Sequence, residues 1–126
     1  MNELRKAIDA SATEVLPGTG TGARRYRFSP GFIGFSGHFP GNPILPAIVQ
    51  IRAVLSLAEE EGGKTLRLAA VRSAKFLAPI RPDEDVSIRY RRRIDSGRNL
   101  CDATLSVAGK TVAAFQLELA EGEAPR

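Results

Sequence analysis

The segment from Pro46 to Glu61 constrains the fold most, because it has the strongest helical pattern in the chain and is apolar around nearly its whole circumference. Its apolar residues are Ala47, Ile48, Val49, Ile51, Ala53, Val54, Leu55, Leu57 and Ala58. A helix of this kind is buried rather than lying on a surface. Pro46 suits the first helical position, and Gly62 and Gly63 end the helix. The rest of the chain is therefore expected to enclose this helix.

Most of the remaining regular structure is predicted as β-strand, apart from a short helix over residues 2–10. Predicted strands cover residues 12–16, 23–28, 66–77, 85–94, 100–107 and 111–119, with an irregular segment over 29–46. The alternation of Val86, Ile88 and Tyr90 with polar residues is typical of a strand with one buried face. Short turns at 96–99 and 108–110 predict antiparallel hairpins. We therefore predict an α+β fold, with one long buried helix wrapped by a curved antiparallel sheet, in a single domain spanning residues 1–126.

Composition excludes several classes of function. His38 and Cys101 are the only residues of their kinds, so neither a zinc site nor an internal disulfide is expected. No apolar run approaches the ~20 residues that cross a bilayer, and the charged start lacks a signal peptide, so we expect a cytoplasmic protein without membrane insertion. The net charge is +4, but few aromatic residues accompany the arginines and no nucleic-acid-binding motif is present. We therefore expect no metal and no nucleic acid.

The only histidine lies immediately before the apolar helix. His38 can exchange a proton near neutral pH, and the turn around it is stiffened by Pro40, Pro43 and Pro46. The helix start that follows offers free N–H groups and a partial positive charge to a developing anion. A proton-transfer residue next to an oxyanion site indicates carbonyl chemistry.

Two segments carry a resemblance to a known family. The first is His38-Phe39-Pro40-Gly41-x-Pro43-x-Leu45-Pro46, and the second is Lys75-Phe76-x-x-Pro79-Ile80-x-Pro82-Asp83. In residue types, spacing and order of elements the chain resembles the hotdog-fold 3-hydroxyacyl-acyl-carrier-protein dehydratases over nearly its whole length. These enzymes remove water from 3-hydroxyacyl thioesters in fatty-acid-type synthesis. The resemblance implies a hotdog fold and a lyase.

The resemblance also implies roles for single residues. It makes His38 the base at C2 of the acyl chain, and it makes the backbone N–H of Ala47 the oxyanion donor. The implied substrate-binding residues are Phe39, Pro40, Gly41, Leu45 and Ile48. No cofactor is implied, because the substrate itself is carried as a phosphopantetheine or coenzyme A thioester. The implied partners are an acyl carrier protein and a second copy of the chain in a homodimer.

Arg52 departs from the family pattern, because it occupies the position of the catalytic Glu or Asp. A guanidinium stays protonated and cannot deliver a proton to a leaving hydroxyl. We expect Arg52 to lie among Ile48, Ile51, Val54 and Leu55, where an unpaired charge is unfavourable. Three interpretations stay open: Arg52 pairs with a carboxylate from this chain or its partner, binds an anionic part of a ligand, or marks a reduced subunit that needs an acid-bearing partner in a heterodimer.

The sequence leaves two further questions open, which are the type of reaction and the role of the cationic residues. The fold also serves acyl thioesterases, so hydrolysis is an alternative to dehydration or to acyl binding without catalysis. Glu59 lies about two turns beyond Arg52, and Asp83 and Glu84 fit solvated loop charges, so none of them is expected to replace the missing acid. The cationic residues either dock an acidic carrier protein or form a solvated face. They are Lys75, Arg81, Arg24, Arg25, Arg27, Arg89, Arg91, Arg92 and Arg93.

Overall fold

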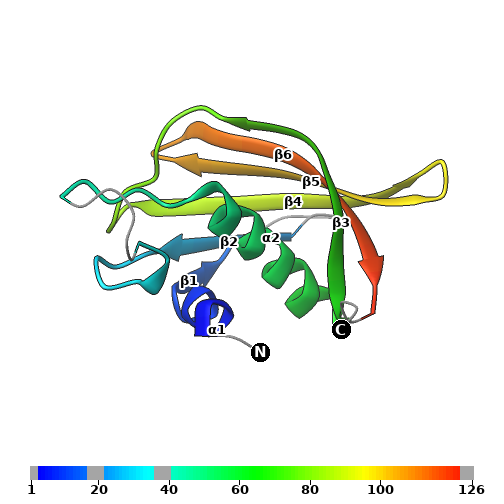
Figure 1. Ribbon diagram of the computed structural model, residues 1–126, viewed down its shortest axis with the longest axis horizontal. Coiled ribbons are helices and arrows are strands. Elements are labelled where there is room, and N and C mark those ends of the chain that lie inside the picture. The colour runs from blue at the N-terminus through cyan, green and yellow to red at the C-terminus, as the bar shows by residue number, and fades with distance from the viewer. Residues whose placement is uncertain (1–2, 17–21, 36–40, 123–126) are drawn as a thin grey trace.

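The computed structural model describes residues 3–16, 22–35 and 41–122, which form one antiparallel sheet and two helices. The elements are α1 (Glu3–Ala10), β1 (Ala12–Val15), β2 (Gly22–Arg27), the 3₁₀ turn η1 (Ile33–Phe35), α2 (Ala47–Gly62), β3 (Leu66–Phe76), β4 (Asp85–Asp95), β5 (Arg98–Val107) and β6 (Lys110–Glu121). The strand order is β1-β2-β4-β5-β6-β3, and every neighbouring pair is antiparallel. Figure 1 shows α2 lying against one face of the curved sheet. The predicted α+β architecture is confirmed.

The alternation in β4 places one side of the strand in the core. Val86 and Ile88 are fully buried and Tyr90 is nearly so, whereas Arg89 and Arg91 are exposed. The two hairpin turns are tighter than predicted, at two residues each: Ser96-Gly97 and Ala108-Gly109. Both turn residues have positive φ in each case, 53° and 76° in the first turn and 52° and 78° in the second. This conformation matches the twist of the flanking strands, which is why it joins adjacent antiparallel strands without a longer loop.

The start of α2 differs from the prediction by one residue. Pro46 is not the first helical residue but the N-cap, with extended φ and ψ of −62° and 151°, and no side chain of the described residues caps the helix. The carbonyl of Pro46 accepts the N–H groups of Val49 and Gln50. In the part of the chain that the structure describes, the N–H groups of Ala47 and Ile48 have no acceptor. At the other end, Gly63 adopts a left-handed φ of 67° and donates its N–H to the carbonyl of Glu59, which terminates the helix.

The predicted burial of α2 is confirmed, except along one exposed side of the helix. The inner face is fully buried, as Ala53, Val54 and Leu57 show. On the outer face, however, Ile48 is 53% exposed and Arg52 is also exposed. The physical reason is that the sheet covers only one side of the helix.

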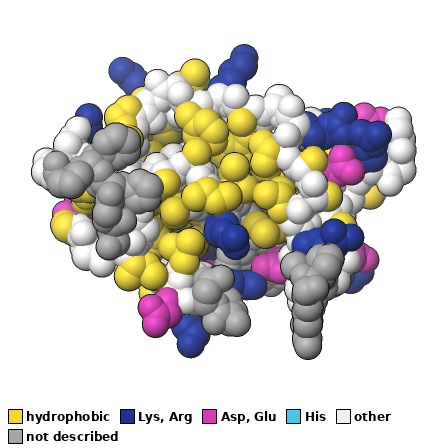
Figure 2. All heavy atoms as spheres, in the orientation of Figure 1, with side chains coloured by type: hydrophobic (Ala, Val, Ile, Leu, Met, Phe, Trp, Pro, Cys, Tyr) yellow, Lys and Arg dark blue, Asp and Glu magenta, His cyan; other side chains and the backbone are white. Residues whose placement is uncertain are grey.

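The outer face of α2 continues onto β3, which is an edge strand of the sheet. Val71, Phe76 and Leu77 are exposed there, at 42%, 43% and 63%. Figure 2 shows hydrophobic side chains gathered over α2 and the neighbouring part of β3. We call this surface, formed by Ile48, Val71, Phe76 and Leu77, the α2–β3 face. A surface of this kind marks a site of contact with another molecule.

The one-sided burial of α2 predicts which truncations of a leucine or isoleucine side chain to alanine destabilise the fold. Leu57 is 1% exposed on the inner face of α2, and Leu57→Ala is expected to lower the free energy of unfolding by about 2–5 kcal/mol. Ile94 is 72% exposed, and Ile94→Ala is expected to change it by no more than about 0.5 kcal/mol. Urea denaturation of both variants measures the difference. Equal effects would contradict the assignment of the core to the inner face of α2.

Candidate functional site

The N-terminal end of α2 is held in place by the segment that precedes it. The N–H of Leu45 donates to the carbonyl of Ile80 at 2.8 Å. Ile80 is completely buried, so this bond ties the start of α2 to the loop that follows β3. The bond joins the two segments whose sequences resemble the dehydratases. They are distant in the chain and adjacent in the structure.

A cavity of about 470 Å³ lies between these two segments. One wall is formed by residues 44–47 with Gln50, and the other by residues 76–79. The ring of Phe76 stacks on Phe115 with centroids 5.9 Å apart, which fixes the second wall. The carbonyl of Val112 accepts the N–H groups of residues 77 and 78 and holds the backbone of that wall. The result is a mainly apolar cavity at a helix start, which is a common setting for a small-molecule site.

The sequence-predicted site residues are only partly brought together. Ala47 and Leu45 line the cavity, and the free N–H of Ala47 lies at the positive end of the helix. Ile48 lies in the same turn, on the exposed outer face. Gly41 is exposed, with φ at +83°. His38, Phe39 and Pro40 lie outside the described residues.

Arg52 is exposed, which corrects the expectation that it lies buried among apolar neighbours. Within the described residues it forms no hydrogen bond or ion pair, and it does not line the cavity. Its apolar neighbours Ile51 and Val54 point instead into the core. The guanidinium therefore lies on the outer face of α2, in the surroundings of the α2–β3 face.

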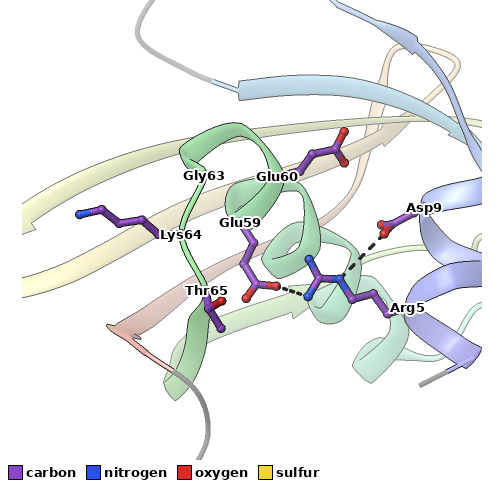
Figure 3. Close-up of a pocket in the computed structure, with 7 residues that line it drawn as sticks. All are labelled: Arg5, Asp9, Glu59, Glu60, Gly63, Lys64 and Thr65. Carbon is purple, nitrogen blue, oxygen red and sulfur yellow. Dashed lines mark ion pairs between the residues drawn. The ribbon is translucent and has the colours of Figure 1, made fainter. Parts of the chain in front are cut away.

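The carboxylates considered as replacements for the family acid have structural partners. Glu59 is 8% exposed; one oxygen accepts the N–H of Leu66 at 2.7 Å, and the other pairs with Arg5 at 2.8 Å. These groups lie in a second cavity, of about 480 Å³, at the opposite end of α2 (Figure 3). Glu84 accepts the backbone N–H of Arg81 at 2.6 Å and so closes its own loop. Asp83 is exposed in that same loop. None of the three lines the cavity at the helix start.

Gln50 is the site residue that sequence reasoning missed. It is 4% exposed, and its Nε2 donates to the carbonyl of Leu45 at 3.1 Å. Its Oε1 is buried and has no hydrogen-bond partner in the described part of the chain. The only sequence feature that could have indicated this role is an amide side chain within an apolar helix, one turn after Ala47.

Cys101 packs in the core of the sheet. It is completely buried in β5, and burial raises the pKa of its thiol to about 11. The thiol is therefore protonated near neutral pH and is a poor nucleophile.

Many of the arginines on the sheet have partners on neighbouring elements. Arg24 pairs with Glu60, Arg25 with Glu14, Arg27 with Asp85, and Arg93 with Asp102. The hydrogen bond from Arg93 lowers the pKa of the Asp102 carboxyl. By contrast, the side chains of Lys75 and Arg81 form no ion pair within the described residues. These two cations flank the segment that forms the second cavity wall.

Comparison with solved structures identifies the fold. The dehydratase heterocomplex ApeI:P from Xenorhabdus doucetiae aligns with a TM-score of 0.72 at 19% identity, covering 86% of this chain and 95% of that one. The PaaI protein of E. coli aligns with a TM-score of 0.66 at 14% identity, covering 93% and 88% of the two chains. The fold is therefore the hotdog fold that the sequence resemblance implies.

Comparison of sequences identifies the family. The 3-hydroxyacyl-[acyl-carrier-protein] dehydratase FabZ of Ligilactobacillus salivarius is 35% identical over 94 residues, which cover 66% of this chain and 65% of the relative. That of Lactobacillus helveticus is 34% identical over 79 residues, covering 55% and 53%. The chain thus spans between about half and two thirds of these relatives. The model of the ApeI-like family, described as ApeI dehydratase, matches residues 19–115, and the chain belongs to this family.

Proposed function

We propose that the chain is a subunit of a dehydratase that acts on 3-hydroxyacyl thioesters, with the acyl group carried on a phosphopantetheine arm. One observation carries the proposal: both dehydratase-like segments converge on one apolar cavity at an uncapped helix start. The dehydratase relatives and the ApeI-like family support the same reaction. No cofactor is needed, because the reaction is an elimination of water.

The proposed reaction assigns one step to each group of this chain. His38 takes the proton from C2, the C2 electron pair forms the C2–C3 double bond, and the C3–O bond breaks. The N–H of Ala47 donates to the thioester oxygen while negative charge develops on it. The leaving hydroxyl receives a proton from an acid, which yields water and a 2-enoyl thioester. Leu45 and Phe76 form apolar walls for the acyl chain.

This chain has no acid at the family position from which the leaving hydroxyl would receive its proton. A guanidinium has no acidic proton to give to a leaving hydroxyl, and no carboxylate is among the described residues that line the cavity. We propose that a second, non-identical hotdog subunit brings the acid to the α2–β3 face. One of the structural relatives is, by its own description, a dehydratase heterocomplex. In a homodimer both subunits would carry arginine at the family position of the acid, so neither would supply an acid there.

The edge of the sheet supports assembly through the same face. β3 spans 11 residues, is paired only with β6 among the described strands, and carries exposed apolar side chains. A long edge strand of this kind pairs readily with a strand of another chain. An acyl carrier protein is the proposed carrier, because the cations of Lys75 and Arg81 flank the cavity and suit an acidic surface. Release of free thiol from the thioester, in place of a 2-enoyl product, would indicate the thioesterase alternative.

His38 is the residue whose replacement tests the reaction. His38→Ala is expected to lower dehydration of a 3-hydroxyacyl carrier-protein thioester by at least about 100-fold, because the C2 proton loses its base. Mass spectrometry of the thioester product measures this in the native assembly. His38→Gln is the control, because it keeps hydrogen bonding but not basicity and is expected to be equally inactive. Full activity of either folded variant would overturn the proposed role.

Arg52 is the residue that tests the need for a partner. The wild-type chain alone is expected to show little dehydration, and Arg52→Glu is expected to raise the rate by at least about 10-fold by placing an acid at the family position. Arg52→Gln, which removes the charge without supplying an acid, is expected to give no such gain. Full activity of the purified wild-type chain, with a loss in Arg52→Glu, would contradict the two-subunit proposal.

The assembly face can be tested with one substitution at each edge of the sheet. Val71→Lys places a charge on the α2–β3 face and is expected to weaken association at least about 10-fold, because a charge buried without a partner is unfavourable. Val15→Lys is the matched control on β1 at the opposite edge, where the valine is 71% exposed. Sedimentation velocity of both variants measures the effect. Dissociation by Val15→Lys alone would place the interface at the other edge.

A further inference from the structure

Gln50 holds a polar atom that the fold leaves without a partner. Its Oε1 is buried and accepts no hydrogen bond in the described chain, although the residue is only 4% exposed. A buried acceptor without a donor is costly, and native structures contain few of them. An apolar residue of similar size would avoid this cost. The amide at this position therefore calls for a donor that arrives from outside the described chain.

The orientation of the amide is fixed by its other end. Nε2 donates to the carbonyl of Leu45 at 3.1 Å. A flipped amide would place Oε1 against that carbonyl oxygen, and two acceptors repel each other. The unpartnered atom is consequently the oxygen, which accepts and cannot donate. A ligand group that satisfies it must carry an O–H or N–H.

The surroundings of Gln50 narrow the choice of ligand. Among the described residues that line the 470 Å³ cavity, Gln50 alone has a polar side chain. Ala47, whose N–H has no acceptor in the described chain, lies one turn earlier on the helix and also lines the cavity. The lining of the cavity therefore combines a free donor with a residue whose side-chain acceptor has no partner among the described residues.

From this arrangement we infer that Gln50 recognises the 3-hydroxyl group of the acyl chain, with Oε1 accepting the hydroxyl proton while the N–H of Ala47 donates to the thioester oxygen. In a 3-hydroxyacyl thioester these two groups are separated by a single methylene carbon, so they suit a donor and an acceptor on successive helix turns. The inference rests on the proposed function. Gln50 is then a specificity residue that selects hydroxylated acyl groups.

The chemistry of the site makes this selection strong. A saturated acyl group lacks the hydroxyl and leaves Oε1 buried without a donor. A site built to hydrogen-bond a substrate hydroxyl rejects the analogue without it much more effectively than an apolar pocket rejects a size difference. The 2-enoyl product also lacks the hydroxyl, so the same atom favours its release.

The test compares two ligands that differ only in the hydroxyl. The ligands are 3-hydroxyoctanoyl pantetheine and octanoyl pantetheine, titrated calorimetrically into the full chain in its native assembly. The His38→Ala background prevents turnover during the titration. With Gln50 intact, the hydroxylated ligand is expected to bind at least about 10-fold more tightly. In Gln50→Met, which keeps the size but removes the acceptor, this preference is expected to disappear.

A matched control separates recognition from bracing of the helix start. Gln116 donates to Asp102 at 2.9 Å on the sheet, away from the cavity, and Gln116→Met is expected to keep the preference. A purely structural role of Gln50 would weaken both ligands equally in Gln50→Met and keep their ratio, which would overturn the inference. Equal binding of both ligands with Gln50 intact also overturns the inference. This outcome is measured without any Gln50 variant, and it leaves the proposed function standing. Binding of neither ligand overturns both.

Discussion

The packing of one face of α2 against the sheet is the constraint on which the rest of the structure depends. The inner face supplies fully buried side chains such as Val54 and Leu57, and each end of the helix is fastened separately. At the C-terminal end, Glu59 bonds the start of β3. At the N-terminal end, Leu45 bonds the carbonyl of Ile80. Because the second fastening uses the residue before the N-cap, it leaves the first N–H groups of the helix without an acceptor among the described residues.

Much of the fold could be predicted because its signals are local. The alternation around Ile88 and the glycines at the turns and at Gly63 each act over a few residues, so the sequence alone locates the strands and the end of α2. The exposure of Arg52 could not be predicted in the same way. The sequence pattern of an apolar helix is the same in two cases: when a sheet covers all sides of the helix, and when a sheet covers one side and a second molecule covers the other. The single chain distinguishes the two cases, because its sheet covers only the inner face of α2.

The part of the candidate site that is formed by the two motifs could be predicted from the sequence. The two dehydratase-like segments meet at one cavity, as their resemblance to an active site implies. Gln50 was missed because a lone amide in an apolar helix has no local pattern. Its meaning depends on which of its two polar ends the fold satisfies, and the hydrogen bond to Leu45 settles that only in three dimensions. His38, Phe39 and Pro40 stay predictions.

The proposed assembly gives Arg52 a physical role that a lost acid alone would not. Covering the α2–β3 face removes water from its surroundings, and a guanidinium that loses water without gaining a carboxylate is strongly destabilising. A subunit that carries an acid brings the compensating charge to that face. Discrimination between partners rests on such unpaired charges as much as on attractive contacts. In this proposal the residue that replaces the acid also selects the subunit that carries it.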